Sequence, residues 1–562
     1  DNSSDGYQWS RQYSDGIGRV YKKEGEGIAL SHILRSESTY DAVGRKASES
    51  NSYLVPGGTP RITEYAYEAK GRLATTTYPE NRTDNTGKVK TQFAYGTGFA
   101  AGKITTTTYV IDAKGNTKTV HKDARGQKVR VIDANGATVA NAYDDMQRLI
   151  QTVDADGNIT TIEYDSLARK IRMFEPNTGT TLYVYDDAGN LTEQIDGKGQ
   201  IIRFSYDAIN RVLLKDMPGT EPDILYEYDS SVNSYGKRRL AKITDAAGTV
   251  EFQYDRRGNT ISSKRTVDSY SFTFHSVYDL QNRVTQVTYP DGYMARNYFS
   301  DAGYLRQVRM LAPGGSFGSA IVTYQGPEVT GQAEVRRLLG NGVMTAVGFD
   351  DSTRRPTYVK TYLKNDTAYA NPIQDLGYTF DDVGNITQVT DGKNAARSES
   401  YGYDSLYRLT QATSGMYGTK SYAYTLGGNL TQKGSTNFYS GNDANCTQPG
   451  NHPVHGVCAD SDGNQYAYDL NGNMITRGSL SSPSRTLEYD SENRLSAIKD
   501  NGIVKLSFVY NHAGERVKKF RPDPMGGLGA GSAITYSIGS LYEVQKKPDG
   551  SEVHTKFFTG AK

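Results

Sequence analysis

Apolar and polar side chains alternate in short runs along much of the chain, and turn-forming residues separate the runs. In residues 181–185, for example, Leu182 and Val184 would face one side of a strand while Tyr183 and Tyr185 face the other. A period of two residues built from Thr, Tyr, Val and Ile predicts β-strands. No long helical pattern interrupts these runs in the sequence, so we expect an all-β chain.

The turns recur at a fixed interval. Tyr-Asp pairs begin at Tyr143, Tyr164, Tyr185 and Tyr206, in steps of 21 residues. Asp and Asn open turns by bonding to their own backbone, and the Gly that often follows supplies a positive φ. The pairs that we assign to this repeat are Tyr40-Asp41, Tyr143-Asp144, Tyr164-Asp165, Tyr185-Asp186, Tyr206-Asp207, Tyr254-Asp255, Tyr278-Asp279, Tyr403-Asp404, Tyr468-Asp469 and Tyr489-Asp490.

A second series of turns lies half a period out of phase with the first, at Asp112, Asp133, Asp154 and Asp196. Each period therefore holds two turns and two strands, which is a β-hairpin of about 21 residues. At this length the chain would form about 25 hairpins, or about 50 strands. Single hairpins cannot bury a face alone, so we expect them to stack into one long sheet. Such a sheet must twist and curl, which predicts a spiralling sheet that curls into a hollow shell.

The composition fits a repeated structural position better than an ordinary core. There are 43 Tyr against 16 Phe and 1 Trp, so one position that needs a ring and a hydroxyl is filled repeatedly. Lys and Arg number 64 and Asp and Glu 63, and this balance argues against a nucleic-acid-binding protein. No run of 18 apolar residues is present in the sequence, so we expect no membrane span. The chain opens with Asp1 and lacks an initiator Met, and we expect a processed product or a fragment of a larger precursor.

The unit Tyr-Asp-x-x-Gly-Asn/Arg, repeated over nearly the whole chain, resembles the Rhs/YD-repeat family. That family includes bacterial polymorphic toxins, the B and C subunits of insecticidal Tc toxin complexes, and animal teneurins. The resemblance implies a hollow cocoon that encloses a toxic polypeptide. Residues 13–20 and 40–45 resemble the beginning of an Rhs region, and residues 538–543 resemble the segment just upstream of the Rhs-associated core. In the family this core carries an Asp-based self-cleavage site and precedes a variable toxin. We expect the chain to end before it, so no catalytic residue is carried over.

The regularity of the repeat varies along the single shell that we predict over residues 1–562. We expect initial repeats at 1–80, regular repeats at 81–298, degenerate repeats with long loops at 299–375, and regular repeats again at 376–562, with a Cys/His loop inserted at 442–460.

The inserted loop holds Cys446, His452, His455 and Cys458, in the pattern C-x5-H-x2-H-x2-C. Four such side chains within 13 residues could hold zinc. We favour a Cys446–Cys458 disulfide, because these are the only two cysteines and the chain resembles secreted proteins. Free thiols are the third interpretation.

The recurring Tyr and Asp would look catalytic only if each were taken singly, and their common spacing indicates architecture. Tyr rings that stack along the sheet would stabilise neighbouring strands by roughly 0.2–1 kcal/mol per cross-strand pair. Residues 154–158 and 460–464 resemble half of a calcium loop, but the first lies in the series of turns. The sequence holds no nucleophile elbow, P-loop, HExxH motif or dinucleotide fingerprint. We therefore predict no catalytic, cofactor-binding or metal site, and no enzymatic activity.

Three hypotheses for the function follow from these features. The leading one is a secreted or cell-surface containment shell that encloses or delivers a polypeptide cargo, either a toxin domain or another segment of the same precursor. The first alternative is an adhesion or recognition module whose outer loops bind a glycan or a cell-surface protein. The second is a structural surface or filament component. The sequence names neither the cargo, the receptor, the secretion route nor the oligomeric state.

Overall fold

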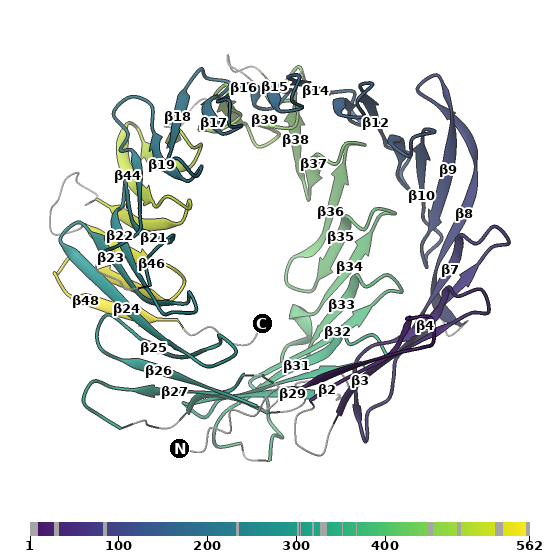
Figure 1. Ribbon diagram of the computed structural model, residues 1–562, viewed down its shortest axis with the longest axis horizontal. Helices are drawn as coiled ribbons and strands as arrows, with labels where there is room; N and C mark the ends of the chain where they lie inside the picture. The colour runs from purple at the N-terminus through teal and green to yellow at the C-terminus, as the bar shows by residue number, and fades with distance from the viewer. Residues whose placement is uncertain are drawn as a thin grey trace. The chain divides into compact units, whose positions relative to one another are not determined.

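The chain folds into antiparallel β-strands along its whole described length (Figure 1). The computed structural model describes residues 9–26, 33–81, 87–231, 235–300, 303, 305–316, 318, 320–325, 334–350, 352–366, 368–441, 443–446, 453–479, 485–522 and 532–557. These residues hold one sheet of 48 strands, which contain more than half of the 562 residues. The one helix among them is the short 3-10 helix η1 (Ala395–Arg397), and it is too short to span a membrane. The predicted all-β fold of tandem hairpins in one sheet is confirmed.

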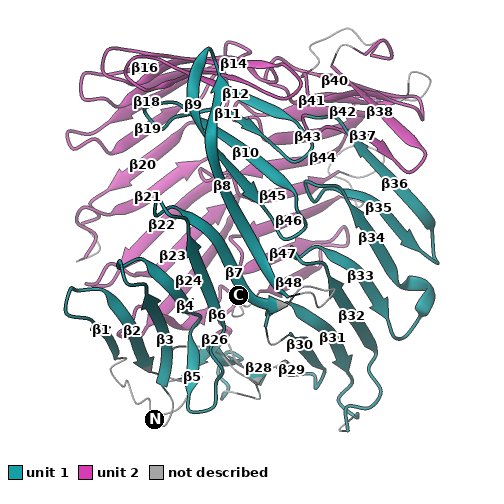
Figure 2. Cartoon of the chain, turned by 90° about the vertical axis from the view of Figure 1, so that its right-hand side faces the viewer, with its two compact units in different colours: residues 1–140, 296–426, 561–562 teal, residues 141–295, 427–560 magenta. Residues whose placement is uncertain are grey.

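The strands group into two compact units, each built from separate segments of the chain (Figure 2). Unit 1 contains Asp1–Ala140, Arg296–Leu426 and Ala561–Lys562, and unit 2 contains Asn141–Ala295 and Gly427–Gly560. The boundaries that we predicted at residues 80, 298 and 375 concern the regularity of the repeat and not compactness, and they stay predictions.

Unit 1 takes its strands from the beginning and the middle of the chain. The first segment holds β1 (Ser10–Ser14), β2 (Val20–Glu26), β3 (Ile33–Tyr40), β4 (Lys46–Ser50), β5 (Tyr53–Val55), β6 (Ile62–Tyr67), β7 (Leu73–Asn81), β8 (Lys88–Ala100), β9 (Lys103–Ile111), β10 (Thr117–Lys122), β11 (Lys128–Ile132) and the start of β12 (Thr138–Tyr143). The second holds most of β26 (Met294–Phe299), then β27 (Leu305–Leu311), β28 (Ala320–Gln325), β29 (Glu334–Leu339), β30 (Met344–Phe349), β31 (Pro356–Tyr362), β32 (Gln374–Phe380), β33 (Ile386–Asp391), β34 (Glu399–Tyr403), β35 (Leu409–Ser414) and β36 (Gly418–Tyr424).

Unit 2 has the same construction. Its first segment holds β13 (Leu149–Val153), β14 (Ile159–Tyr164), β15 (Lys170–Glu175), β16 (Gly179–Tyr185), β17 (Leu191–Ile195), β18 (Ile201–Tyr206), β19 (Val212–Asp216), β20 (Ile224–Tyr228), β21 (Leu240–Asp245), β22 (Gly248–Tyr254), β23 (Thr260–Val267), β24 (Tyr270–Tyr278) and β25 (Val284–Thr288). Its second holds β37 (Leu430–Lys433), β38 (Thr436–Ser440), β39 (Val457–Asp460), β40 (Asn464–Tyr468), β41 (Met474–Ser479), β42 (Arg485–Tyr489), β43 (Leu495–Asp500), β44 (Ile503–Tyr510), β45 (Arg516–Arg521), β46 (Ala533–Ile538), β47 (Tyr542–Lys546) and β48 (Glu552–Lys556).

A β-bulge precedes the Tyr-Asp turns. The register of β14 on β15 shifts between Glu163 and Tyr164, and the same shift occurs at Tyr185 in β16 and at Tyr206 in β18. A bulge adds one residue to one strand and increases the local twist. Because the spacing is constant, successive hairpins repeat the same distortion at the same place.

Buried apolar side chains form local clusters. In unit 1, Met344 and Ala346 of β30 pack with Tyr362 of β31. In unit 2, rings from both segments meet: the centroids of Phe272 and Tyr536 are 6.2 Å apart, and those of Phe274 and Tyr542 are also 6.2 Å apart.

Candidate functional site

The Tyr-Asp pairs all lie at the same place in their hairpins. Each Tyr that we assigned to the repeat, from Tyr40 to Tyr489, is the last residue of its strand. The following Asp opens a turn, and its backbone N–H donates to the carbonyl four residues later, as Asp165 does to Arg169 at 3.0 Å. The pairs therefore form the turns at one end of the hairpins.

The carboxylate of the Asp holds this turn together. Oδ1 of Asp165 accepts the N–H groups of Leu167 and Arg169 at 2.9 Å each, and Oδ2 accepts Nε of Arg169 at 2.7 Å. Ala168 has a φ of 63°, a conformation that Gly supplies in sister turns such as the one at Gly189. Burial alone would raise the pKa of Asp165, but the N–H donors and Arg169 outweigh burial and lower it. The carboxylate is ionised and engaged within its own turn.

The Arg that closes the turn also joins it to the next hairpin. Nη1 of Arg169 donates to the carbonyl oxygen of Asp186 at 2.9 Å, and its guanidinium lies 4.9 Å from the centroid of the Tyr185 ring. The Tyr185 hydroxyl donates back to the carbonyl oxygen of Lys170 at 2.9 Å. The same pairing of Arg and Tyr occurs at Arg19/Tyr40, Arg45/Tyr67, Arg72/Tyr95, Arg148/Tyr164, Arg211/Tyr228, Arg239/Tyr254, Arg408/Tyr424 and Arg494/Tyr510.

The tyrosines form a ladder whose contacts differ from the predicted ring stacking. Tyr164, Tyr185 and Tyr206 occupy equal positions, as the spacing predicts, but the guanidinium of Arg148 covers the ring of Tyr164 at 4.8 Å and that of Arg169 covers Tyr185. Equivalent positions on successive hairpins are two strands apart, or about 9.5 Å, which is too far for two rings to touch. The guanidinium fills this gap.

The second series of turns uses its Asp in the same way. Oδ1 of Asp154 accepts the N–H groups of Asp156 at 2.9 Å and Asn158 at 2.8 Å, and Oδ2 accepts the Asn158 amide at 2.9 Å. The carboxylate of Asp154, in the segment that resembles half of a calcium loop, therefore stabilises its own turn. Within the described part of the chain, no group of three or more His, Cys, Asp or Glu side chains is placed to hold a metal ion.

In unit 2 these second turns meet the turns of the other segment along a line of polar contacts, which we call the unit 2 seam. The amide of Asn471 donates to Oδ2 of Asp196 at 2.5 Å, and Nζ of Lys198 lies 3.3 Å from Oδ2 of Asp469. Further pairs across the seam are Asp156 with Gly427, Lys215 with Glu492, Glu221 with Ser491, Asp268 with Lys518 and Tyr536, and Asp291 with Lys556. The two segments of unit 2 are thus joined at these places by polar residues of turns and by strand residues such as Lys215, Lys518 and Lys556.

Asp245 is a buried carboxylate of this seam. Its side chain is 1% exposed, Nη2 of Arg265 donates to Oδ1 at 2.7 Å, and the backbone N–H of His512 donates to Oδ2 at 3.0 Å. Burial alone would raise the pKa of Asp245, but His512 and Arg265 outweigh burial and lower it. The buried charge is paired from both segments.

The loop inserted at 442–460 supplies one end of the unit 2 seam. Cys446 and Cys458 are joined as a disulfide, with their Cα atoms 5.3 Å apart. Between them in sequence, His455 places Nε2 at 3.0 Å from Oδ2 of Asp154, and its backbone N–H donates to Oδ1 of Asn177 at 3.0 Å. A disulfide leaves no thiolate for zinc, and the proposed ligand His452 lies outside the described residues. His455 is thus a residue of the unit 2 seam, where it contacts Asp154 and Asn177.

Unit 1 has a seam of its own with the same chemistry. Nζ of Lys114 lies 3.1 Å from Oδ2 of Asp381, and the amide of Asn135 donates to Oδ2 of Asp404 at 3.4 Å. The Tyr407 hydroxyl donates to the carboxylate of Asp112. Burial and this carboxylate raise the pKa of Tyr407 to about 12.

The seams were not foreseen from the sequence. The sequence places the second series of Asp residues in turns, as the structure shows. It gives no reason to expect that Lys198, Lys215 and His512 contact the other segment of unit 2. The one signal that the sequence offers is a cationic side chain at a turn tip, and such side chains are common on any solvated surface.

Residues 2–214 match the family model described as the teneurin YD-shell, which confirms the predicted resemblance to YD-repeat proteins over this part of the chain. No curated protein matches the chain in sequence.

Several solved structures share the fold over nearly the whole chain. TcdB2-TccC3 matches with a TM-score of 0.75 and 16% identity, over 97% of this chain and 32% of that one. TcdB2-TccC3 without its hypervariable C-terminal region matches with a TM-score of 0.77 and 16% identity, over 98% and 31%. The Tc holotoxin pore of Photorhabdus luminescens, with a TccC3 mutation, matches with a TM-score of 0.77 and 17% identity, over 98% and 31%. The chain thus spans about a third of the length of these structures.

Proposed function

We propose that this chain is a wall segment of a toxin-associated YD-repeat shell that encloses a polypeptide cargo outside the cell, and that it has no enzymatic activity of its own. The observation that carries the proposal is the shared fold with TcdB2-TccC3 over 97% of the chain. Since the chain spans about a third of that length, other segments of a precursor or partner chains would extend the wall and supply the cargo.

The use of the recurring polar residues supports a structural role. The Asp of a repeat turn binds its own backbone, as Asp165 does, and the Arg and Tyr bind the neighbouring hairpin. The turns of the second series bind the opposite segment of the same unit. A wall needs these contacts between neighbours, whereas an active site needs polar groups that converge on an open space.

One face of the first segment of unit 2 suits loose contact with a polypeptide. Leu182 is 37% exposed and Val184 is 45% exposed. The register places Arg172 opposite Leu182 and Glu193 opposite Val184, and Arg172 is paired with Glu163 at 2.8 Å. Apolar and charged side chains therefore alternate on this face. Such a surface offers many weak contacts without the large continuous apolar patch that marks a tight interface.

The proposal is tested by protease protection of a passenger. A toxin-like polypeptide is fused to the C-terminus of the chain, and its digestion by a nonspecific protease is compared with that of the same passenger added free to the unfused chain. We expect the fused passenger to persist at least tenfold longer. Digestion at the same rate in both samples would contradict containment and would favour the recognition role instead.

A further inference from the structure

One hairpin of unit 1, formed by β8 and β9, departs from the repeat. Tyr95 occupies the repeat position, because the guanidinium of Arg72 covers its ring at 4.0 Å and its hydroxyl donates to the carbonyl oxygen of Leu73 at 2.8 Å. In the regular repeats the strand ends at this Tyr and an Asp opens the turn. Here Gly96 follows, and β8 continues to Ala100 before the chain turns into β9. With 13 residues, β8 is the longest strand in the described part of the chain.

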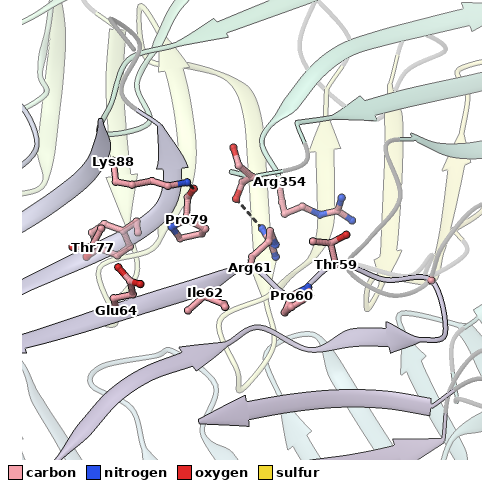
Figure 3. A pocket seen from close by; sticks show the side chains of 12 residues that line it. Thr59, Pro60, Arg61, Ile62, Glu64, Thr77, Pro79, Lys88 and Arg354 are labelled. Carbon is pink, nitrogen blue, oxygen red and sulfur yellow. Dashed lines mark hydrogen bonds between the residues drawn. The ribbon is translucent and has the colours of Figure 1, made fainter. Parts of the chain in front are cut away.

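The extension of this hairpin reaches past the strands on either side. β7 pairs with β8 only as far as Gln92, and β10 pairs with β9 only from Thr106 onward. Among the described residues, those from 96 to 105 therefore pair only with each other. In Figure 1 their turn lies beyond the end of β10. At its other end, β8 begins beside a pocket of about 560 Å³, where the amine of Lys88 donates to the carbonyl oxygen of Pro79 (Figure 3).

The inner face of the extension packs closely against β10. Ala100, Thr105 and Thr107 are buried on this face. Nδ1 of His121, on β10, lies 3.2 Å from Oγ1 of Thr105 and 3.2 Å from Oγ1 of Thr107. A Cβ on Gly98 would lie 2.6 Å from Oγ1 of Thr107, so this close approach needs a glycine. The extension is therefore anchored to unit 1 by its inner face.

The outer face of the extension carries an apolar pair next to the turn. Phe99 and Ile104 lie directly opposite one another in the register of β8 on β9. Phe99 is 68% exposed, the highest fraction of any aromatic side chain in the described residues, and Ile104 is 77% exposed, the highest of any large apolar side chain there. Single exposed apolar side chains are common, but directly opposed residues of a hairpin have Cβ atoms about 5 Å apart. Phe99 and Ile104 therefore form one continuous surface, which we call the apolar tip.

The charged side chains of this hairpin are all positive. β8 and β9 contain three Lys and no Asp or Glu. One of them, Lys103, is exposed at the turn beside Ile104. Exposed apolar side chains flanked by Lys are typical of segments that enter a membrane interface, where an aromatic ring is also favoured. Anionic lipid attracts a Lys that lies near the membrane surface.

We propose that the apolar tip inserts into the head-group region of a lipid bilayer that contains anionic lipid. Phe99 and Ile104 enter the boundary between head groups and acyl chains, and Lys103 contacts an anionic head group. Insertion stops at this boundary, because the backbone N–H and C=O groups on the outer edges of residues 96–105 need water as a partner. This binding is separate from the containment of a cargo and does not depend on it.

Flotation of the full chain with lipid vesicles measures this binding. Vesicles of phosphatidylcholine alone are compared with vesicles that contain about one third phosphatidylserine, at about 1 mM lipid, because two side chains bind more weakly than one acyl chain. We expect the bound fraction to be at least fivefold larger on the anionic vesicles. Absence of binding to anionic vesicles would overturn the proposal and would point to an apolar pocket of a protein partner instead. Equal binding to both kinds of vesicle would contradict the preference for anionic lipid.

Two double variants locate the binding on the hairpin. Phe99→Thr/Ile104→Thr keeps residues that favour β-strands and removes the apolar tip, so we expect the bound fraction to fall at least fivefold. Ile17→Thr/Val43→Thr is the matched control, since Ile17 and Val43 are turn residues of unit 1 that are 75% and 74% exposed, and it should bind as the parent chain does. Unchanged binding of the tip variant, or an equal loss in the control, would contradict the assignment.

A fluorescent reporter shows directly whether the tip enters the membrane. Trp9 is the only Trp of the chain, so Trp9→Phe/Phe99→Trp moves the single indole to the apolar tip. We expect its emission to shift to shorter wavelength with anionic vesicles and to stay unchanged with phosphatidylcholine vesicles. A variant that floats with anionic vesicles without this shift would overturn the proposal.

Discussion

The Asp of a Tyr-Asp turn uses its two carboxylate oxygens for different tasks. In the turn at Asp279, Oδ1 accepts the N–H groups of Gln281 and Arg283 at 2.9 Å each, while Oδ2 accepts Nε of Arg283 at 2.6 Å. The turn at Asn511 shows that the first task needs no charge, since its Oδ1 accepts the N–H groups two and four residues later at 3.0 and 2.9 Å. The negative charge of the Asp is therefore needed for the ion pair with the Arg, and this Arg contacts the next hairpin.

Two substitutions at Asp279 separate these tasks. Asp279→Ala removes both, and we expect it to favour local opening of the turn by about 1–2 kcal/mol, or roughly tenfold faster amide exchange in residues 279–283. Asp279→Asn keeps the acceptor for the backbone and loses only the ion pair, so its effect should be about 0–1 kcal/mol. Hydrogen exchange followed by mass spectrometry measures both, and equal effects would contradict the division of tasks.

The Tyr of the repeat is expected to act through its hydroxyl and its ring independently. Tyr185→Phe removes the hydrogen bond to the Lys170 carbonyl and keeps the contact with Arg169, so we expect a loss of about 0.5–1.5 kcal/mol in local stability. Tyr185→Leu removes both and should cost about 0.5–1 kcal/mol more. If Tyr185→Leu and Tyr185→Phe raised the amide exchange rates of β15 and β16 equally, the contact between Arg169 and Tyr185 would contribute nothing to local stability.

At the scale of the elements, the hairpins were predictable and the seams were not. Alternation in residues 181–185 predicts β16, and the 21-residue period predicts two turns per unit, because strand and turn preferences are local. The spacing also placed the tyrosines correctly, but it could not show that Arg169 lies between two hairpins. The seam joins residues such as Lys198 and Asn471, which are 273 positions apart. Their meeting depends on the twist accumulated over many hairpins, which no local pattern encodes.

The Cys446–Cys458 bond is expected to hold His455 in the unit 2 seam. Peptide mapping of the unreduced protein should find the two cysteine peptides linked, and the closed loop should contribute roughly 3 kcal/mol to local stability. Reduction should then speed amide exchange around Asp154, the partner of His455, and leave the turn at Asp245 unchanged. Two free thiols, or a bound zinc that a chelator removes, would contradict this assignment.

The unit 2 seam is expected to open only in strong acid. The pKa values of Asp154, Asp245 and Asp268 all lie below the ordinary value of 3.8, because partners across the seam or in the turn outweigh the effect of burial. A carboxylate with a lowered pKa contributes stability that is present above its ordinary pKa and is lost as the pH falls through the lowered value. Amide exchange of the seam turns, corrected for the intrinsic rate, should therefore be constant from pH 7 to pH 5 and rise below about pH 4. Opening between pH 7 and pH 5 would contradict the role of these carboxylates.

At the scale of the whole molecule, contacts between neighbouring hairpins recur along the sheet. An Arg guanidinium covers the Tyr ring of the next hairpin in both units, as at Arg169/Tyr185 and Arg408/Tyr424, beside apolar clusters such as Met344 with Tyr362. In a repeat protein of this kind each hairpin is stabilised by its neighbours, so the chain can lengthen without a larger core. A TcdB2-TccC3 chain about three times longer shares this fold over 32% of its length.

The central claim, that this wall encloses a polypeptide, is tested most directly by small-angle neutron scattering with contrast variation. A deuterated passenger is fused to the C-terminus of the unlabelled chain, and the separation between the centres of mass of wall and passenger is measured. Enclosure predicts a separation close to zero and a radius of gyration of the passenger smaller than that of the wall. A separation of tens of ångströms, with the passenger beside the wall, would contradict the account.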